Sequence, residues 1–144
     1  MMLINLIFVK IVKKIDKNMT HININDILLK HSILFDYDTK DSFGYIFPHY
    51  LFEVKNSIHY KTLINNDFNL YNRLITTTNQ LEHSEIIFKD LIKNFNINRL
   101  ENEKIILQWL PEINKYVVND GCHRLSLLLY NNITEINKKY IKTI

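Results

Sequence analysis

Glycine, proline and cysteine are scarce in this chain of 144 residues, which contains two glycines, two prolines and one cysteine. A single cysteine excludes an internal disulfide and a cysteine-rich zinc site, and it fits a reducing compartment. Asn, Ile and Lys are frequent instead, a pattern typical of AT-rich coding sequences, so runs of Asn carry little chemical information. Because glycine is so rare here, Gly121 marks a turn where a positive φ angle is needed.

Strong charge and long apolar runs are also lacking. The formal net charge of +3 permits contact with nucleotides or nucleic acid, but it does not predict a large surface for a phosphate backbone. The apolar start, Met1 to Val12, is interrupted by Asn5 and Lys10 and is too short to cross a bilayer. It lacks the features of a signal peptide as well. We therefore expect no transmembrane segment and a cytoplasmic location.

Hydrophobic residues make up 47% of the chain, which is enough for the core of one domain. Local patterns predict the elements in chain order. They are a short helix within 20–34, a helix and a loop over 55–72, a strand over 74–78, a helix from 85 to about 95, a strand over 104–110, a turn over 111–114, a returning strand over 115–118, a helix from about 125 to 130, and a last strand after 133. This order indicates a compact α+β unit.

The helix after Ser84 has the clearest periodicity. Phe88, Leu91, Ile92 and Phe95 recur at i, i+3, i+4 and i+7, so they lie on one helical face. Ser84 is a suitable N-cap residue, because its hydroxyl can accept a hydrogen bond from the first turn.

The most informative segment is Asn119 to Arg124, which reads Asn-Asp-Gly-Cys-His-Arg between a β-like run and an apolar helical stretch. A glycine turn from strand to helix leaves the first N–H groups of the helix without partners, and such an end attracts anions, phosphate above all. His123 and Arg124 stand in the first turn, where positive side chains do not favour the helix dipole. We expect this cationic pair to meet an external anion.

The motif resembles that of the ParB/sulfiredoxin superfamily. Gly121 to Arg124 match the Gly-Cys-His-Arg of sulfiredoxins letter for letter. The Asp-Gly-His-His-Arg of the free serine kinases is matched except at Cys122, and only Gly121 and Arg124 match the Gly-Glu-Arg-Arg of ParB proteins. The resemblance covers about residues 75 to 135. It implies an α+β domain with a small mixed sheet flanked by helices over 75–144, with residues 1–74 as an N-terminal elaboration of uncertain structure.

In that superfamily the turn binds nucleotide phosphates, which implies ATP with Mg²⁺ as ligand here. The residues that the resemblance assigns to the nucleotide are Gly121, Cys122, His123 and Arg124. Gly121 allows close backbone approach, whereas His123 and Arg124 bind phosphate oxygens. The planar guanidinium of arginine suits this task, because it can bind two oxygens together.

The first interpretation of the chemistry is phosphoryl transfer to a small-molecule or protein hydroxyl, as in the free serine kinases. Kinase members of the superfamily carry an acidic residue in about the region of Glu82, which makes Glu82 the candidate base or metal-organising group. Asp120 can hold Mg²⁺ or orient His123. The plainer alternative is that Glu82 is a solvated loop acid, that Ser84 is only a cap, and that Asp120 bonds its own backbone.

The second interpretation is an ATP-dependent reductase similar to sulfiredoxin, with Cys122 as nucleophile. A cysteine at a helix N-terminus beside His and Arg should have a lowered pKa, which favours the thiolate. Against it, the sulfiredoxin pattern has a second glycine and aromatic residues near the turn, where this chain has Asn119 and Asp120. The plainer alternative is that Cys122 is only a small residue, at a position that accepts several residue types.

The third interpretation is a nucleotide-sensing or ParB-like, DNA-associated module that binds without turnover. It would need a DNA-binding extension, and no such extension is evident after the motif. Lys138, Lys139 and Lys142 form a small basic stretch that is more typical of a solvated end. A nucleic-acid partner is therefore only weakly supported.

Other candidate metal ligands show no recognisable spacing. The histidines His21, His31, His49 and His59 are scattered and form no zinc motif. The acidic stretch from Asp36 to Asp41 lacks the central Gly and distal Glu of a calcium loop, so we expect a solvated loop there.

Overall fold

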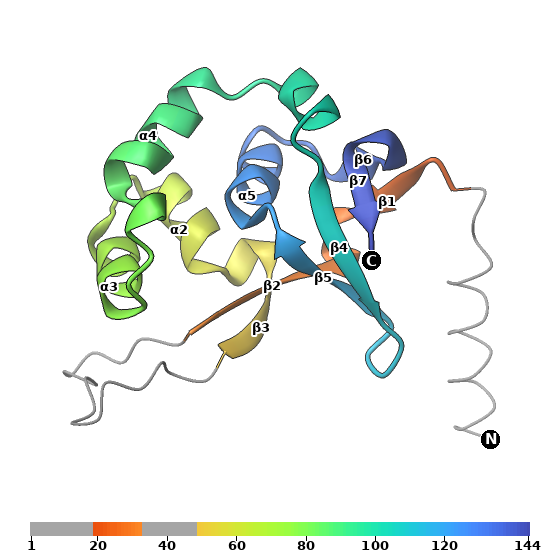
Figure 1. The fold of residues 1–144 in the computed structure, drawn as a ribbon, viewed down its shortest axis with the longest axis horizontal. Helices are drawn as coiled ribbons and strands as arrows, with labels where there is room; N and C mark the ends of the chain where they lie inside the picture. Colours follow the sequence, from red (N-terminus) through yellow and green to blue (C-terminus); the bar gives the residue numbers. More distant parts are fainter. Residues whose placement is uncertain (1–18, 33–48) are drawn as a thin grey trace.

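The computed structural model describes residues 19–32 and 49–144, and the fold is a mixed α+β arrangement (Figure 1). Its main sheet has five strands in the order β3-β2-β5-β4-β7. The strands of this sheet are β2 (Ile27–Ser32), β3 (His49–Glu53), β4 (Ile105–Leu110), β5 (Lys115–Asp120) and β7 (Ile141–Thr143). A separate antiparallel pair joins β1 (His21–Asn23) to β6 (Glu135–Asn137). The predicted fold class is confirmed at this level, as an α+β fold with a small mixed sheet.

The hairpin of β4 and β5 follows the sequence prediction. The strands pair antiparallel with Leu107 opposite Val118, and both residues are buried. The connecting turn includes Asn114 at a φ of 55°, a left-handed conformation that asparagine tolerates. β5 continues to Asp120, two residues beyond the predicted end at Val118. The Asp120–Gly121 corner therefore directly follows a paired strand.

Strand β2 corrects the prediction of a helix within 20–34. Ile27, Leu29 and His31 are buried, whereas Lys30 is exposed, so burial follows the period of two that a strand requires. β2 pairs in parallel with β5, with Ile27 opposite Tyr116 and Leu28 opposite Val117. Tertiary pairing across the chain has overridden a weak local helix pattern. The parallel pairing brings the carboxyl ends of β2 and β5 to the same edge of the sheet.

Four α-helices occur among the described residues: α2 (Ile58–Asn65), α3 (Asn69–Thr77), α4 (Glu85–Asn94) and α5 (Cys122–Tyr130). α4 confirms the predicted helix, and its Ser84 cap accepts a hydrogen bond from the Ile87 amide. The predicted strand over 74–78 is wrong, because Leu74 to Thr77 form the end of α3. Tyr71, Leu74 and Ile75 are buried at helical spacing, and this burial outweighs the β preference of the threonines.

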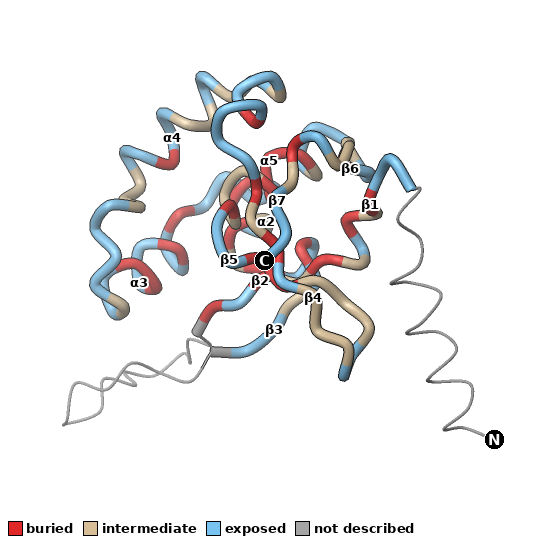
Figure 2. The backbone as a smooth tube through the Cα atoms, turned by 45° about the vertical axis from the view of Figure 1, so that its right-hand side comes forward, coloured by how far each residue is buried: buried red, intermediate tan, exposed pale blue. Residues whose placement is uncertain are grey.

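Helix α5 lies between the sheet and the other helices. Leu125 and Leu128 belong to the core formed with the sheet, whereas Leu127 packs with Tyr71 and Phe88 in a second core. Figure 2 shows that α5 is largely buried while α4 is mostly exposed. The helix ends at Asn131 and Asn132, as the sequence predicts, and Asn132 has a φ of 64°. α5 is therefore held on two sides, which fixes its first turn.

Some expectations fall outside the described residues, namely those for the apolar start Met1 to Val12 and for the acidic stretch Asp36 to Asp41. The main sheet contains strands from both sides of the proposed division at residue 74, since β2 lies between β3 and β5. Among the helices that the structure describes, none is long and apolar enough to cross a membrane.

Candidate functional site

The strand-to-helix turn at Gly121 is formed as the sequence predicts. Gly121 has φ 115° and ψ 22° and is the N-cap of α5, directly after the last residue of β5. A Cβ atom there would lie 3.1 Å and 3.2 Å from the side-chain carbons of Ile105. Both the backbone angle and the close neighbour therefore require glycine. Gly121 has no side chain that could cap the helix, so no side chain of the N-cap residue pairs with the first N–H groups of α5.

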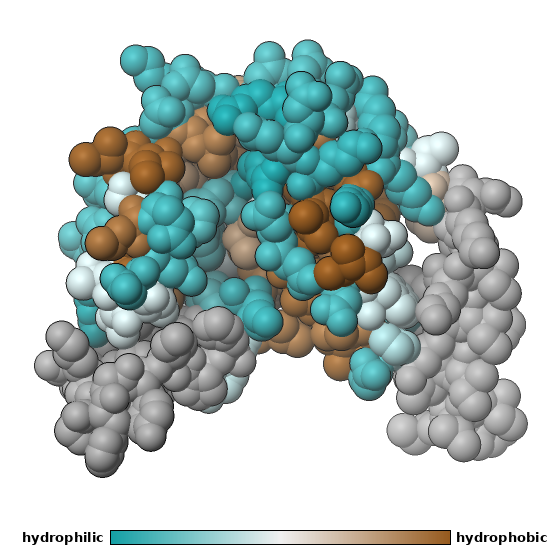
Figure 3. Space-filling view, viewed as in Figure 1, coloured by the Kyte–Doolittle hydropathy of each residue, from teal (hydrophilic) through white to brown (hydrophobic). Residues whose placement is uncertain are grey.

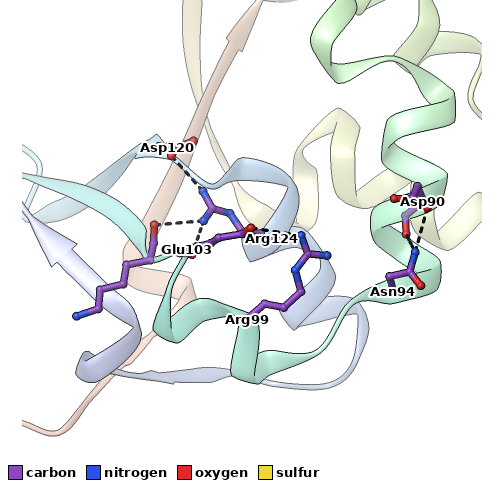
Figure 4. A network of polar contacts seen from close by, with 7 residues as sticks. Asp90, Asn94, Arg99, Glu103, Asp120 and Arg124 are labelled. Carbon is purple, nitrogen blue, oxygen red and sulfur yellow. Dashed lines mark hydrogen bonds and ion pairs between the residues drawn. The ribbon is translucent and has the colours of Figure 1, made fainter.

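Arg124 is held tightly beside this turn (Figure 4). Its Nη1 donates to the carbonyl oxygen of Glu103 and, at 3.3 Å, to that of Lys104. Its Nη2 lies 3.2 Å from Oδ2 of Asp120. The arginine side chain is only 14% exposed, whereas that of Asp120 is 65% exposed. Arg124 thus links the residues before β4 to the turn. Its Nη2 is paired with the exposed carboxylate of Asp120.

His123 lies in an aromatic enclosure. Its ring stacks on His83 at 4.8 Å and meets the edges or faces of His59, Tyr71 and Phe88 at centroid distances of 4.6, 5.8 and 4.8 Å. Burial, together with smaller effects of the nearby His83 and Arg124, lowers the pKa of His123 to about 3. The expectation of a cationic pair is therefore wrong for His123, which is neutral at physiological pH.

The protonated nitrogen of His123 follows from its hydrogen bond to Tyr71. The Tyr71 hydroxyl has one proton, which it donates to the backbone carbonyl of His83. The same hydroxyl lies 2.7 Å from Nε2 of His123, so it accepts a hydrogen bond there. Nε2 thus carries the single ring proton and Nδ1 carries none. Because the Nε2 proton is already bonded to Tyr71 and Nδ1 has no proton, His123 cannot donate a hydrogen bond to a phosphate oxygen.

Four of the six histidines lie close together around this point, which we call the histidine cluster: His31, His59, His83 and His123. The ring centroids of His31 and His59 are 5.8 Å apart, and His59 bridges to His123. The members come from β2, α2, a 3₁₀ turn at Leu81–His83 and α5. No spacing in the sequence predicts the cluster, because the fold brings its members together from distant positions.

Cys122 does not have the properties expected of a nucleophile. Burial raises the pKa of its thiol to about 11, and Asp120 contributes to the rise, while contacts with the Lys30 backbone and Arg124 oppose it only in part. The prediction of a lowered pKa is therefore wrong, because desolvation outweighs the favourable helix terminus. The thiol stays protonated at neutral pH.

Glu82 lies in the 3₁₀ turn Leu81–His83, and its side chain is 68% exposed. Its Oε1 is 3.9 Å from Nε2 of His83. Glu82 lines neither of the two hollows described next, whereas His83 lines both. Any role of Glu82 at the turn would therefore act through His83.

Two hollows flank the Gly121 turn and share His83, Asp120, Gly121 and His123. The first, here the apolar hollow, has a volume of about 150 Å³. It is completed by Ile87, Phe88, Leu91, Glu103 and Arg124. Apolar side chains also reach the surface around α4 (Figure 3), where Ile86 and Ile87 are exposed.

The second, here the histidine hollow, has a volume of about 200 Å³. It is completed by Lys30, His31, His59, Leu74, Thr78, Gln80, Val118, Asn119 and Cys122. It lies at the carboxyl ends of the parallel strands β2 and β5, which supply Lys30, His31 and residues 118–120 to its lining.

Metal binding rests on a single predicted residue. Within residues 19–32 and 49–144, no group of three or more His, Cys, Asp or Glu side chains could hold a metal ion. Mg²⁺ is commonly held by one or two carboxylates together with substrate phosphates, and exposed Asp120 fits that mode.

No family model, curated protein or solved structure matches this chain. The likeness to the ParB/sulfiredoxin superfamily therefore stays a prediction from the motif.

Proposed function

We propose that this protein binds the phosphate groups of a nucleotide, ATP with Mg²⁺ in the first instance, at the Gly121 turn. The observation that carries the proposal is the turn itself. Gly121 at a φ of 115° joins a strand of the sheet to a helix that has no side-chain cap, and the two hollows flank this turn. Backbone N–H groups at such a helix start bind phosphate through their direction and through the helix dipole.

In this proposal the side chains of the motif have different tasks. Arg124 supplies positive charge, and a phosphate oxygen takes the place of the Asp120 carboxylate on its guanidinium. His123 is neutral and positions the first turn of α5 through Tyr71. Asp120, once released, is the residue that would hold Mg²⁺ together with the nucleotide phosphates.

We further propose that binding leads to phosphoryl transfer, in keeping with the resemblance to the free serine kinases. The acceptor hydroxyl oxygen forms a bond to the terminal phosphorus, and the bond from that phosphorus to the bridging oxygen breaks, so that ADP leaves with the electron pair. The hydroxyl proton passes to water. Asp120 lines both hollows and serves this step by holding Mg²⁺, whereas Glu82 lines neither hollow and its role as a base stays a prediction.

The reductase interpretation is disfavoured by Cys122. A buried thiol with a pKa of about 11 supplies almost no thiolate at neutral pH. A module that binds nucleotide without turnover has the same site as the proposed enzyme, and experiment separates the two.

Binding is tested by thermal unfolding with ATP, CTP and GTP, each with and without Mg²⁺. A nucleotide at one hundred times its dissociation constant adds about 2.7 kcal/mol to the free energy of unfolding. We expect a stabilising shift with at least one nucleotide. Absence of any shift at millimolar nucleotide would contradict the proposed function.

Turnover is tested by ADP formation from ATP, in water alone and with small hydroxyl compounds added as acceptors, with Asp120→Asn and Glu82→Ala compared against Glu112→Ala. Glu112 is an exposed acid in the β4–β5 turn and serves as the matched control. We expect Asp120→Asn to lower the rate the most. Nucleotide binding without ADP formation in the wild type, with or without the acceptors, would leave the non-catalytic module as the function.

A further inference from the structure

His123 offers a ligand one hydrogen-bond acceptor and no donor. Its Nε2 proton is bonded to the Tyr71 hydroxyl, which leaves the lone pair of Nδ1. Within residues 19–32 and 49–144, no group donates a hydrogen bond to this Nδ1. A ligand that displaces water from this atom must therefore supply a donor of its own, or binding leaves the acceptor unpaired at a cost in free energy.

The Nδ1 atom of His123 can be reached by a ligand. In the described part of the chain, the side-chain polar atoms that are fully buried without a partner belong to His59, Trp109 and Asn114. Nδ1 of His123 also lacks a partner but is not one of these atoms, so it keeps accessible surface. His123 lines both hollows, and aromatic side chains enclose the rest of its ring. Nδ1 therefore faces the space beside the Gly121 turn.

A phosphate group does not match this acceptor. At neutral pH the oxygens of a nucleotide's phosphates carry few protons, so they accept hydrogen bonds and do not donate them. The N–H groups at the start of α5 and the guanidinium of Arg124 suit such oxygens, whereas Nδ1 of His123 does not. A nucleotide must meet Nδ1 with another group. The donors nearest its phosphates are the ribose hydroxyls, because the ribose carries the phosphate.

The apolar hollow offers the other features that a sugar requires. Its lining combines an apolar wall with two carboxylates, from Ile87, Phe88, Leu91, Glu103 and Asp120. Carboxylates accept hydrogen bonds from sugar hydroxyls, and apolar side chains pack against sugar C–H groups. Because this hollow adjoins the turn, a ribose can lie in it while a phosphate on the same sugar is bound at the start of α5.

We propose that His123 selects ribonucleotides, because its Nδ1 accepts a hydrogen bond from a ribose hydroxyl of the bound nucleotide. This assignment rests on the proposed function, and it replaces the phosphate contact that the resemblance implies for His123. A deoxynucleotide would cover Nδ1 without supplying a donor, and a site built to bind a hydroxyl rejects an analogue that lacks it. Tyr71 is part of the selection, since its hydrogen bond with Nε2 keeps the proton off Nδ1.

The first test compares the affinities of the full chain for ATP, 2′-deoxy-ATP and 3′-deoxy-ATP, each with Mg²⁺, by isothermal titration calorimetry. We expect at least one deoxy analogue to bind at least about tenfold more weakly than ATP. Equal affinities for the three nucleotides would overturn the selection by His123, while the proposed function would stand. If none of the three binds, the proposed function and the selection fail together.

Two substitutions of His123 separate the acceptor from the hydrogen bond to Tyr71. His123→Gln places an amide N–H near the position of Nε2 and removes the acceptor at Nδ1, so ATP and the deoxy analogues should bind alike. His123→Asn places an amide oxygen near the position of Nδ1, so the preference for ATP should persist. The control is His21→Gln, at an exposed histidine that lines neither hollow, and it should leave the preference unchanged. A preference that is as strong in His123→Gln as in the wild type would overturn the proposal.

The proton position is measured in the wild type, so this test does not depend on the folding of a variant. The ¹⁵N chemical shifts of the His123 ring distinguish a protonated nitrogen from an unprotonated one. We expect an unprotonated Nδ1 in the free protein, with a signal that moves more on saturation with ATP than with the weaker deoxy analogue. A protonated Nδ1, or a signal that responds equally to ATP and to both analogues, would overturn the proposal.

Discussion

Gly121 is the residue on which the site depends. Its φ is 115°, and a Cβ atom at this position would lie 3.1 Å from the side chain of Ile105. Any residue other than glycine would therefore strain the local backbone. The sequence predicts this glycine turn because the cause is local, namely a strand, a glycine and an apolar helix in direct succession. The protonation of the neighbouring side chains cannot be predicted in the same way, because it depends on burial by distant elements.

Replacing Gly121 with alanine should lower the free energy of unfolding by at least about 1–2 kcal/mol, since a left-handed backbone is unfavourable for a residue with a Cβ. Chemical denaturation measures this change. Asn119→Ala, at an exposed neighbouring position, is the control and should have a small effect. An alanine variant at 121 as stable as the wild type would mean that the turn is not as described.

The Cys122 thiol should react slowly. With a pKa of about 11, it has little thiolate below pH 9, and burial further limits access. Modification by a disulfide reagent at pH 7 should be far slower in the native protein than in the denatured protein. Rapid native-state reaction at pH 6 would restore the reductase interpretation.

At the scale of elements, the site is assembled by α3, the 3₁₀ turn Leu81–His83 and α5. Tyr71 of α3 bonds to both of the others, through the His83 carbonyl and the His123 ring. Sequence patterns place a strand at the end of this helix, so they miss Tyr71 as a site residue. The apolar residues Tyr71, Leu74 and Ile75 stand at i, i+3 and i+4, and this spacing is the sequence signal that could have identified the helix.

Tyr71→Phe should cost about 1–3 kcal/mol, because it leaves the part-buried carbonyl of His83 and the Nε2 proton of His123 without partners. Thermal or urea unfolding measures the loss. The control is Tyr130→Phe, since Tyr130 is an exposed residue at the end of α5. Equal stability of the two variants would argue against the Tyr71–His123 bond.

The histidine cluster should make the fold sensitive to acid. His123 has a pKa of about 3 in the folded state against an ordinary 6.5, so both states are neutral above pH 6.5. Below that pH the unfolded chain takes up a proton that the folded chain does not. The free energy of unfolding therefore falls by about 1.4 kcal/mol per pH unit for this residue, down to about pH 3. His59 contributes with the same sign.

Urea unfolding between pH 7.5 and 4.5 measures this dependence. His123→Phe should flatten it, while His21→Asn, at an exposed histidine outside the cluster, should not. A wild-type stability that is constant over this range would contradict the neutral, buried state of His123.

At the scale of the whole molecule, the sheet unites the two halves of the chain. β2 lies in the interior of the sheet and pairs with β5, and β1 pairs with β6. The elements after Ser84 can largely be predicted from the sequence, because helix periodicity and a hairpin are local features. The pairing of Ile27 with Tyr116 cannot be predicted, because no local pattern specifies which distant strand completes a sheet. The same holds for His59, which contacts His123 only through the fold.

A fragment of residues 75–144 should therefore not fold alone, since it lacks β2 and the helix α2 that contacts α5. Circular dichroism and amide NMR of the fragment should show no cooperative unfolding and little signal dispersion. A stable, well-dispersed fragment would instead support residue 75 as a true domain boundary.

The most direct measurement of the central claim is amide NMR of the full chain during titration with Mg²⁺ and a non-hydrolysable ATP analogue. We expect the largest shifts at the backbone N–H groups of Gly121, Cys122 and His123, at the start of α5. Saturable shifts confined to another surface, or no shifts at millimolar analogue, would contradict a phosphate site at this turn.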